Sequence, residues 1–210
     1  MVTQVAPGLW HVDCETLDRP NVFLVDDGDL TLVDAGWPGD EDTVREGIED
    51  AGYSLGSIDR VLLTHADADH VGTLSRLTPE LDAPVYVHPQ EAPLVSGERL
   101  PPWTARLGFG AFHRLYYRRL TLPDLPIRTV TDGDTVGGFR AYHTPGHTPG
   151  HLAYTHAETG AAFLGDLAYG WRDGLRPTGW LTSHDAAENR ESIESFLDRC
   201  PAFEYACAGH

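Results

Sequence analysis

Four side chains that can bind a metal ion lie within a stretch of six residues, 65–70, with the sequence HADADH. The stretch directly follows the apolar run Val61-Leu62-Leu63, which has the composition of a short strand. Imidazole nitrogens and carboxylate oxygens are common ligands of zinc, iron and manganese in proteins. A polar turn with a helix-capping Asp is the alternative that this stretch alone leaves open. The four candidate ligands are His65, Asp67, Asp69 and His70.

Three further candidate ligands lie beside other predicted strand ends. His147 lies in the loop 144–151 (TPGHTPGH), where prolines and glycines shape the backbone between two strands. Asp166 follows the predicted strand 161–164, and His210 follows the last predicted strand. Loops held by a rigid scaffold are where proteins commonly place functional side chains. Candidate ligands at four separate strand ends are hard to explain as turns, and they predict one shared metal centre.

The predicted elements form two β-rich halves, each followed by helices. Sheet packed on sheet with helices outside is the arrangement that covers every apolar sheet face. The chain is expected to form one domain over 1–210, with an insertion carrying one helix at about 97–126. The predicted strands are 9–12, 22–25, 30–34, 58–63, 84–87, 127–130, 139–142, 151–154, 161–164 and 204–207, and the predicted helices are 44–51, 70–77 and 186–197.

These segments resemble, in order and in approximate spacing, the metallo-β-lactamase-fold superfamily. Its hydrolytic members carry an H-x-H-x-D-H run, a distant His, a bridging Asp and a last His, and the similarity spans almost the whole chain. Thr64 and Gly72 beside the first stretch match the pattern, as does the loop 144–151. That loop is similar to the one in the glyoxalase II and acyl-homoserine lactonase branches. The resemblance implies an α+β fold, a four-layer αββα sandwich with the metals at its edge.

The resemblance also implies a role for each candidate ligand. Two divalent metal ions are expected, with zinc as the main expectation and iron or manganese as alternatives. Two cations a few ångströms apart lower the pKa of a bridging water, so a metal-bound hydroxide would be the nucleophile. Asp69 is also expected to be catalytic, because it can orient this water and move its proton. The first ion is assigned to His65, Asp67 and His147, the second to Asp69, His70 and His210, and Asp166 bridges them.

Asp67 departs from the hydrolytic pattern, which has its second His at this place. A carboxylate adds negative charge and harder oxygen character to the first metal site. The flavodiiron branch of the same fold is similar to this chain in having an acidic residue there. Three functions follow. The leading one is a metallohydrolase of a small ester, thioester or lactone; the alternatives are a di-iron redox or oxygen-handling protein and a metal-poor binding module without turnover.

Residues near the expected metal rim are candidates for contact with substrate, namely Trp37, Trp171, Arg172 and Arg176. Asp34 ends a predicted strand and is expected to organise the loop beneath the metals. The basic and aromatic stretch 112–120 predicts a substrate lid, a dimer helix or a salt-bridged surface helix. The other histidines are not expected to bind metal or substrate. A structural or supporting role is expected for His143 and His151, and surface or capping positions are expected for His88, His113, His156 and His184.

The composition limits the partners of the chain. Its net charge of −17 comes from 32 acidic and 15 basic residues, and every basic residue is Arg. Nucleic acids and anionic membranes are therefore excluded as expected partners, because they require a positive surface. A small-molecule substrate is expected, and a homodimer is an alternative to a monomer. An acidic surface without Lys resembles that of proteins from salt-loving microbes, where salt screens the self-repulsion.

The location expected from the sequence is the cytoplasm. No apolar run approaches the roughly 20 residues that span a bilayer. The first residues lack the basic segment and apolar core of a secretory signal. The three cysteines, Cys14, Cys200 and Cys207, form no C-x-x-C pair and fit reduced thiols.

Overall fold

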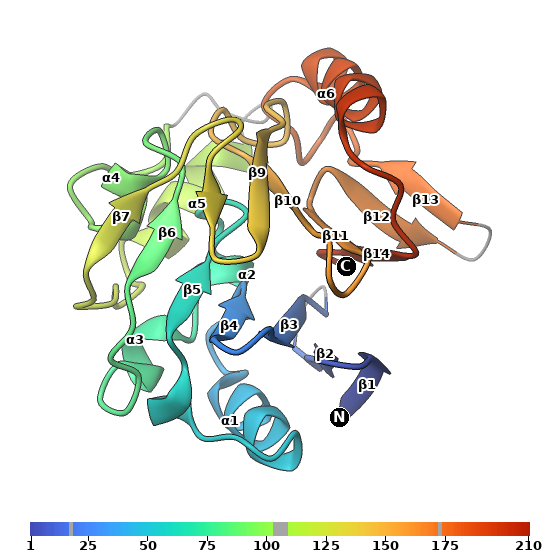
Figure 1. Cartoon of the computed structure of the whole chain (residues 1–210). Helices are drawn as coiled ribbons and strands as arrows, with labels where there is room; N and C mark the ends of the chain where they lie inside the picture. The colour runs from blue at the N-terminus through green and yellow to red at the C-terminus, as the bar shows by residue number, and fades with distance from the viewer. Residues whose placement is uncertain (17–18, 103–108, 172–173) are drawn as a thin grey trace.

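Two sheets lie face to face in the computed structural model, and helices cover their outer faces. In Figure 1, α1 (Glu41–Asp50) lies beyond the first sheet, and α6 (Ala186–Arg199) lies at the opposite end of the view beyond the second. The four-layer αββα sandwich is therefore confirmed. The structure describes residues 1–16, 19–102, 109–171 and 174–210.

The first sheet joins an antiparallel meander to a parallel half. Within the described ranges its seven strands are, in spatial order, β1 (Val2–Ala6), β2 (Leu9–Asp13), β3 (Asn21–Asp26), β4 (Leu30–Val33), β5 (Arg60–Leu62), β6 (Val85–Val87) and β7 (Ile127–Thr129). Pairing is antiparallel from β1 to β4 and parallel from β4 to β7. The carboxyl ends of β4, β5 and β6 consequently meet at one edge of the sheet.

The second sheet is antiparallel except at one edge. In the part of the chain that is described, its five strands are, in spatial order, β14 (Tyr205–Ala208), β11 (Ala161–Gly165), β10 (Leu152–His156), β9 (Phe139–His143) and β8 (Thr135–Val136). The strands β11 and β14 are parallel, with Gly165 opposite Ala208. The residues that follow these two strands therefore leave the sheet at the same edge.

Three apolar clusters hold the layers together. One lies between the first sheet and its helices and includes Leu32 and Ile48, and another fills the space between the sheets around Tyr154 and Phe163. The last joins the second sheet to α6 through Phe196. Burial of such side chains stabilises the fold by about 1.5–3 kcal/mol each. Strands covered on both faces read as continuous apolar runs, as β11 does.

The expected helix 70–77 is instead two short helices, α2 (Ala68–Val71) and α3 (Leu74–Leu77). The backbone explains the break, because the N–H of Gly72 donates to the carbonyl of Gly36 at 2.9 Å rather than continuing the helix. The loop that contains Gly36 is thereby tied to the residues that follow the candidate ligands 65–70. No helix of the described residues is long and apolar enough to cross a membrane.

Several short elements were not expected from the sequence. The strands β1 and β8 are among them, together with the hairpin β12 (Ala168–Trp171) and β13 (Gly174–Pro177). Two short helices are also new, η1 (Leu55–Ser57) and α4 (Ala92–Val95). The segment expected as a helix-bearing insertion contains α5 (Phe109–Tyr117).

Candidate metal centre

All seven predicted ligand residues come together at the edge where strand ends of both sheets meet. The donor atoms of four of them lie within 4.8 Å of one another, and those of a second group do likewise, with Asp166 in both groups. Oδ2 of Asp67 lies 3.6 Å from Nε2 of His65 and 3.2 Å from Nε2 of His147. The groups are Asp69, His70, Asp166 and His210 on one side, and His65, His147 and Asp166 on the other.

The buried donor atoms fit two metal ions. Nε2 of His65, Nε2 of His70 and Oδ1 of Asp166 are buried and make no hydrogen bond to the described residues. Buried polar atoms are nearly always satisfied by a partner. Since these atoms lie in the two donor groups, cations between them would supply the missing partners. A set made only of imidazoles and carboxylates suits zinc, iron or manganese.

A hydrogen-bond chain below the site orients two of the histidines. The hydroxyl of Thr64 donates to Oδ2 of Asp34 at 2.8 Å, so its oxygen is left to accept from Nδ1–H of His65 at 3.0 Å. Asp34 also accepts from Nδ1–H of His70 at 2.9 Å. Both rings therefore carry their hydrogen on Nδ1 and direct the lone pair of Nε2 at the site. The organising role expected for Asp34 agrees with this geometry.

His151 holds the backbone that carries the bridging residue. Its Nε2 accepts from the N–H of Asp166 at 3.0 Å, and its Nδ1–H donates to the hydroxyl of Thr144 at 2.8 Å. Burial lowers the pKa of His151 well below its usual value, and the nearby histidines add to this shift. The ring is neutral, as acceptance at Nε2 requires. A Cβ on Gly165 would lie 2.8 Å from this nitrogen, so the approach needs glycine there.

Glu91 ties the two loops of candidate ligands together, and no sequence pattern indicates this residue. It is buried, accepts from the N–H of Ala66 at 3.3 Å, and accepts from the N–H of Gly150 at 2.9 Å. One carboxylate thus joins the 65–70 stretch to the loop of His147. An isolated Glu in a polar stretch of sequence carries no signal for such a role.

Opposite charges in the site shift the pKa values of its residues. Burial acts to lower the pKa of His210, but the carboxylates of Asp166 and Asp69 outweigh it and raise the pKa to about 10. Burial acts to raise the pKa of Asp166, but the imidazoles around it bring the pKa well below its usual value. Protons therefore compete with metal ions for this site, and metal binding should release them.

The hairpin β12–β13 borders the second donor group. The hydroxyl of Tyr169, another residue that sequence reasoning missed, donates to Oδ2 of Asp166 at 3.0 Å. Trp171 and Arg176 lie on the same face of the hairpin as Tyr169. Trp171 is two residues after Tyr169 in β12, and Arg176 is paired with Tyr169 across the hairpin. The Arg176 guanidinium lies 5.1 Å from the centre of the Trp171 ring. Arg172 lies outside the described residues.

Trp37 is held by the segment expected as an insertion. Its ring stacks on that of Tyr116 in α5, with 5.0 Å between the ring centres. The same helix brings His113 to the site, where Nε2 lies 3.5 Å from Oδ1 of Asp67. The expectation that His113 is an ordinary surface residue was wrong. Asp67 lies more than 40 positions before His113 in the sequence, so no local sequence pattern indicates their contact.

Two other expectations for surface histidines were also wrong. His156 is buried, with Nε2 at 3.0 Å from Oδ2 of Asp27 and Nδ1 at 3.0 Å from the hydroxyl of Thr159. His88 is buried as well, and its ring stacks on that of His143, with 4.3 Å between ring centres. His156 thus makes polar contacts inside the fold and His88 packs on His143, and neither belongs to the two donor groups.

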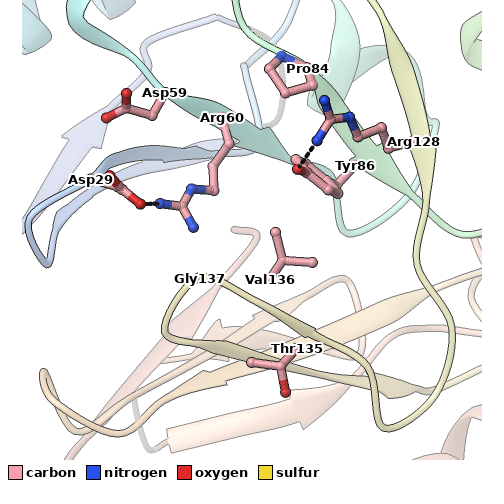
Figure 2. Close-up of a pocket in the computed structure, with 9 residues that line it drawn as sticks. All are labelled: Asp29, Asp59, Arg60, Pro84, Tyr86, Arg128, Thr135, Val136 and Gly137. Atoms are coloured by element: carbon pink, nitrogen blue, oxygen red, sulfur yellow. Dashed lines mark hydrogen bonds and ion pairs between the residues drawn. The ribbon is translucent and has the colours of Figure 1, made fainter.

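A separate cleft lies at the other end of β5, where Arg60 begins the strand that leads to His65. Its volume is about 540 Å³. Figure 2 shows that both arginines of the cleft have partners there: Arg60 pairs with Asp29, and Arg128 donates to the hydroxyl of Tyr86 at 2.9 Å. The cleft lies between residues of the first sheet and residues 135–137 of the second, and it contains none of the seven candidate metal ligands.

Comparison with known proteins identifies relatives with the same fold. A family model described as the metallo-beta-lactamase superfamily matches residues 16–210. The uncharacterized protein YobT of Bacillus subtilis (strain 168) is 29% identical over 83% of this chain and 69% of its own length. The probable metallo-hydrolase YybB of the same organism is 29% identical over 81% of this chain and 71% of its own length.

A solved structure supports the same assignment. The crystal structure of TTHA1623 in a di-iron-bound form has 29% sequence identity and a TM-score of 0.70, and the match covers 94% of this chain and 90% of that chain. The expected enzyme class, a metallohydrolase, is confirmed by these relatives. The family model matches nearly the whole chain, and so this protein belongs to the metallo-beta-lactamase superfamily.

Proposed function

We propose that this protein hydrolyses a small ester, thioester or lactone with two divalent metal ions. The observation that carries the proposal is the pair of donor groups that share Asp166, with His65 and His147 on one side and His70 and His210 on the other. When bound, the two ions would activate a water molecule as nucleophile and polarise the carbonyl oxygen of the substrate. The loop of His147, similar to that of the glyoxalase II and lactonase branches, supports a carboxylic ester or thioester as the substrate class.

Asp69 is the proposed proton carrier. Its Oδ2 lies 3.4 Å from Nε2 of His210, at the edge of the donor group. Its side chain is 15% exposed, compared with 9% for Asp67 and 2% for Asp166, so among these three carboxylates it has the best access to water. A carboxylate in this place can hold the attacking water and pass its proton to solvent or to the leaving group.

The hairpin face beyond Tyr169 is the proposed contact surface for substrate. Trp171 is 60% exposed and offers an apolar ring, and Arg176 offers a cation that can pair with a carboxylate of the substrate. Trp37 forms the proposed opposite wall through its stack on Tyr116. On a chain with net charge −17, an exposed Arg near the metal site would draw an anionic substrate toward it.

Zinc remains our main expectation for the metals, and iron is the specific alternative. Asp67 favours a harder ion than a histidine would at that place, and the similar TTHA1623 structure contains two irons. This pair of observations also supports a second candidate function, a di-iron redox or oxygen-handling protein. Iron in the purified protein together with oxygen consumption in the presence of a reductant would favour that function. A protein that contains zinc alone and shows no redox activity would reject the di-iron function.

The test is to purify the protein in high salt, measure bound metals by elemental analysis, and assay thioester, lactone, β-lactam and phosphodiester substrates. We expect two metal ions per chain and turnover of a thioester or lactone. Asp69→Asn should lower the turnover number by about 10²–10⁴-fold. Because Asp69 also lies in the second donor group, bound metal is measured in the same variant, and turnover is compared at equal metal content. Full metal occupancy with no turnover of any of the four substrate classes would reject the proposal.

A further inference from the structure

The helix α5 is fixed against the first donor group from several directions. Tyr117 is fully buried in the cluster between the first sheet and its helices, and Tyr116 stacks on Trp37. Arg114 donates to the carbonyl of Pro101 at 2.8 Å, which ties the helix to the chain before it. A residue on this helix therefore has a defined place relative to the metal-binding loops.

His113 approaches one oxygen of Asp67, and the metal-binding histidines face the other. Nε2 of His113 lies 3.5 Å from Oδ1, whereas Oδ2 lies 3.2 Å from Nε2 of His147 and 3.6 Å from Nε2 of His65. The side chains of His113 and Asp67 are 13% and 9% exposed. The two oxygens of this carboxylate consequently have different surroundings, one toward the metal position and one toward α5.

We propose that His113 is a positioning residue for Asp67 and that it sets the affinity of the first metal site. This inference rests on the binuclear site proposed above. With its hydrogen on Nε2, the His113 ring would direct this N–H toward Oδ1 across 3.5 Å, leave Oδ2 to the metal, and oppose binding through both oxygens. The dipole of this N–H also stabilises the negative charge that Asp67 brings to a place where the hydrolytic pattern has a neutral His. Substitution of a residue that contacts and orients a metal ligand typically lowers metal affinity by about 10–100-fold.

The experiment compares His113→Leu with His113→Gln. Leucine removes the donor, whereas the amide nitrogen of glutamine can occupy about the same place as Nε2 but is a poor metal ligand. Metal affinity is measured by titration with cobalt(II) against a competing chelator, in a His210→Ala background that weakens the second site. The absorption spectrum of bound cobalt reports the ligand set directly. Leu115→Ala, an exposed position on the same helix, is the matched control, and thermal unfolding of the metal-free proteins checks the fold.

We expect His113→Leu to bind the first cobalt ion about 10–100-fold more weakly, with His113→Gln and Leu115→Ala close to the parent protein. Equal loss in both His113 variants, with a changed cobalt spectrum in His113→Gln, would show that His113 is itself a ligand and overturn the positioning role. Unchanged affinity in His113→Leu would overturn it too. If the unaltered chain binds no metal, the proposed function fails instead, so the two failures are distinguishable.

Discussion

Oδ2 of Asp34 lies 2.9 Å from Nδ1 of His70, and this contact turns Nε2 of the same ring to within 3.2 Å of Oδ1 of Asp166. Asp34 occupies left-handed backbone, with φ of 58°, directly after β4. Asp and Asn tolerate this conformation better than other non-glycine residues. The left-handed backbone of Asp34 thus holds its carboxylate beneath the second donor group.

Asp34→Asn should weaken metal binding without unfolding the protein. Asn keeps the backbone conformation and one carbonyl oxygen. It lacks the negative charge of the carboxylate that accepts hydrogen bonds from Thr64 and His70. We expect about 10–100-fold lower metal affinity and a parallel loss of activity at limiting metal. Titration with the metal found in the native protein measures the effect. An Asn variant with parental affinity would show that the charge of Asp34 is irrelevant.

Asp67→His tests whether the carboxylate is adapted to this site. The variant restores the hydrolytic pattern and removes one negative charge from the first donor group. If the natural site is functional, we expect a shift in metal preference toward zinc and a changed ratio of kcat to KM, with activity already present in the parent. Metal content and hydrolysis that both rise from nothing would instead support the metal-poor module. Elemental analysis and the substrate assays above distinguish the outcomes.

Removal of the metals should lower stability as well as abolish hydrolysis. Without cations, the buried Nε2 atoms of His65 and His70 make no hydrogen bond to the described residues, although each lies close to a carboxylate. A ligand that binds only the folded state at 100 times its Kd stabilises it by about 2.7 kcal/mol. We therefore expect a lower Tm after dialysis against a chelator and recovery on addition of the native metal. An unchanged Tm would argue that the site does not bind metal tightly.

Acid should destabilise the fold partly through His88. Burial lowers the pKa of His88 to about 4, and the stacked His143 ring adds to the shift. Between the ordinary value of about 6.5 and this lowered value, the unfolded chain binds more protons at His88 than the folded chain does. Stability should thus fall as pH is lowered from 6.5 toward 4. His88→Asn, measured metal-free by denaturant unfolding, should show a smaller fall than the parent; an equal fall in both would refute the assignment.

Salt should stabilise the protein through its acidic charge. With a net charge of −17 and no Lys, self-repulsion opposes the compact state in dilute buffer. The screening length falls to about 3 Å at 1 M salt. We expect Tm to rise as KCl increases from about 0.1 M to 1 M, and KCl is preferred over sulfate because sulfate stabilises most proteins by exclusion from the surface. A flat dependence on KCl would contradict the salt-adapted interpretation.

The sequence by itself indicated the candidate ligands and the strands that precede them. His65, His147 and Asp166 follow short apolar runs or Gly/Pro loops, and these local features depend on neighbours in the chain. The layering of two sheets between helices followed in the same way, because each apolar face needs a cover. Boundaries were less exact, as the split of helix 70–77 shows, since a hydrogen bond from Gly72 to Gly36 is a tertiary contact.

Only the tertiary structure decided which residues contact and orient the candidate ligands. Glu91 spans from Ala66 to Gly150, and His113 reaches Asp67 from a helix that the sequence marks only as an insertion. These partners lie tens of residues apart in the chain, and their spacing obeys no helical or strand period. They meet because the packing of α4, α5 and the two sheets brings their backbones together. The candidate metal ligands can thus be predicted from local sequence, whereas the residues that orient them are determined by packing.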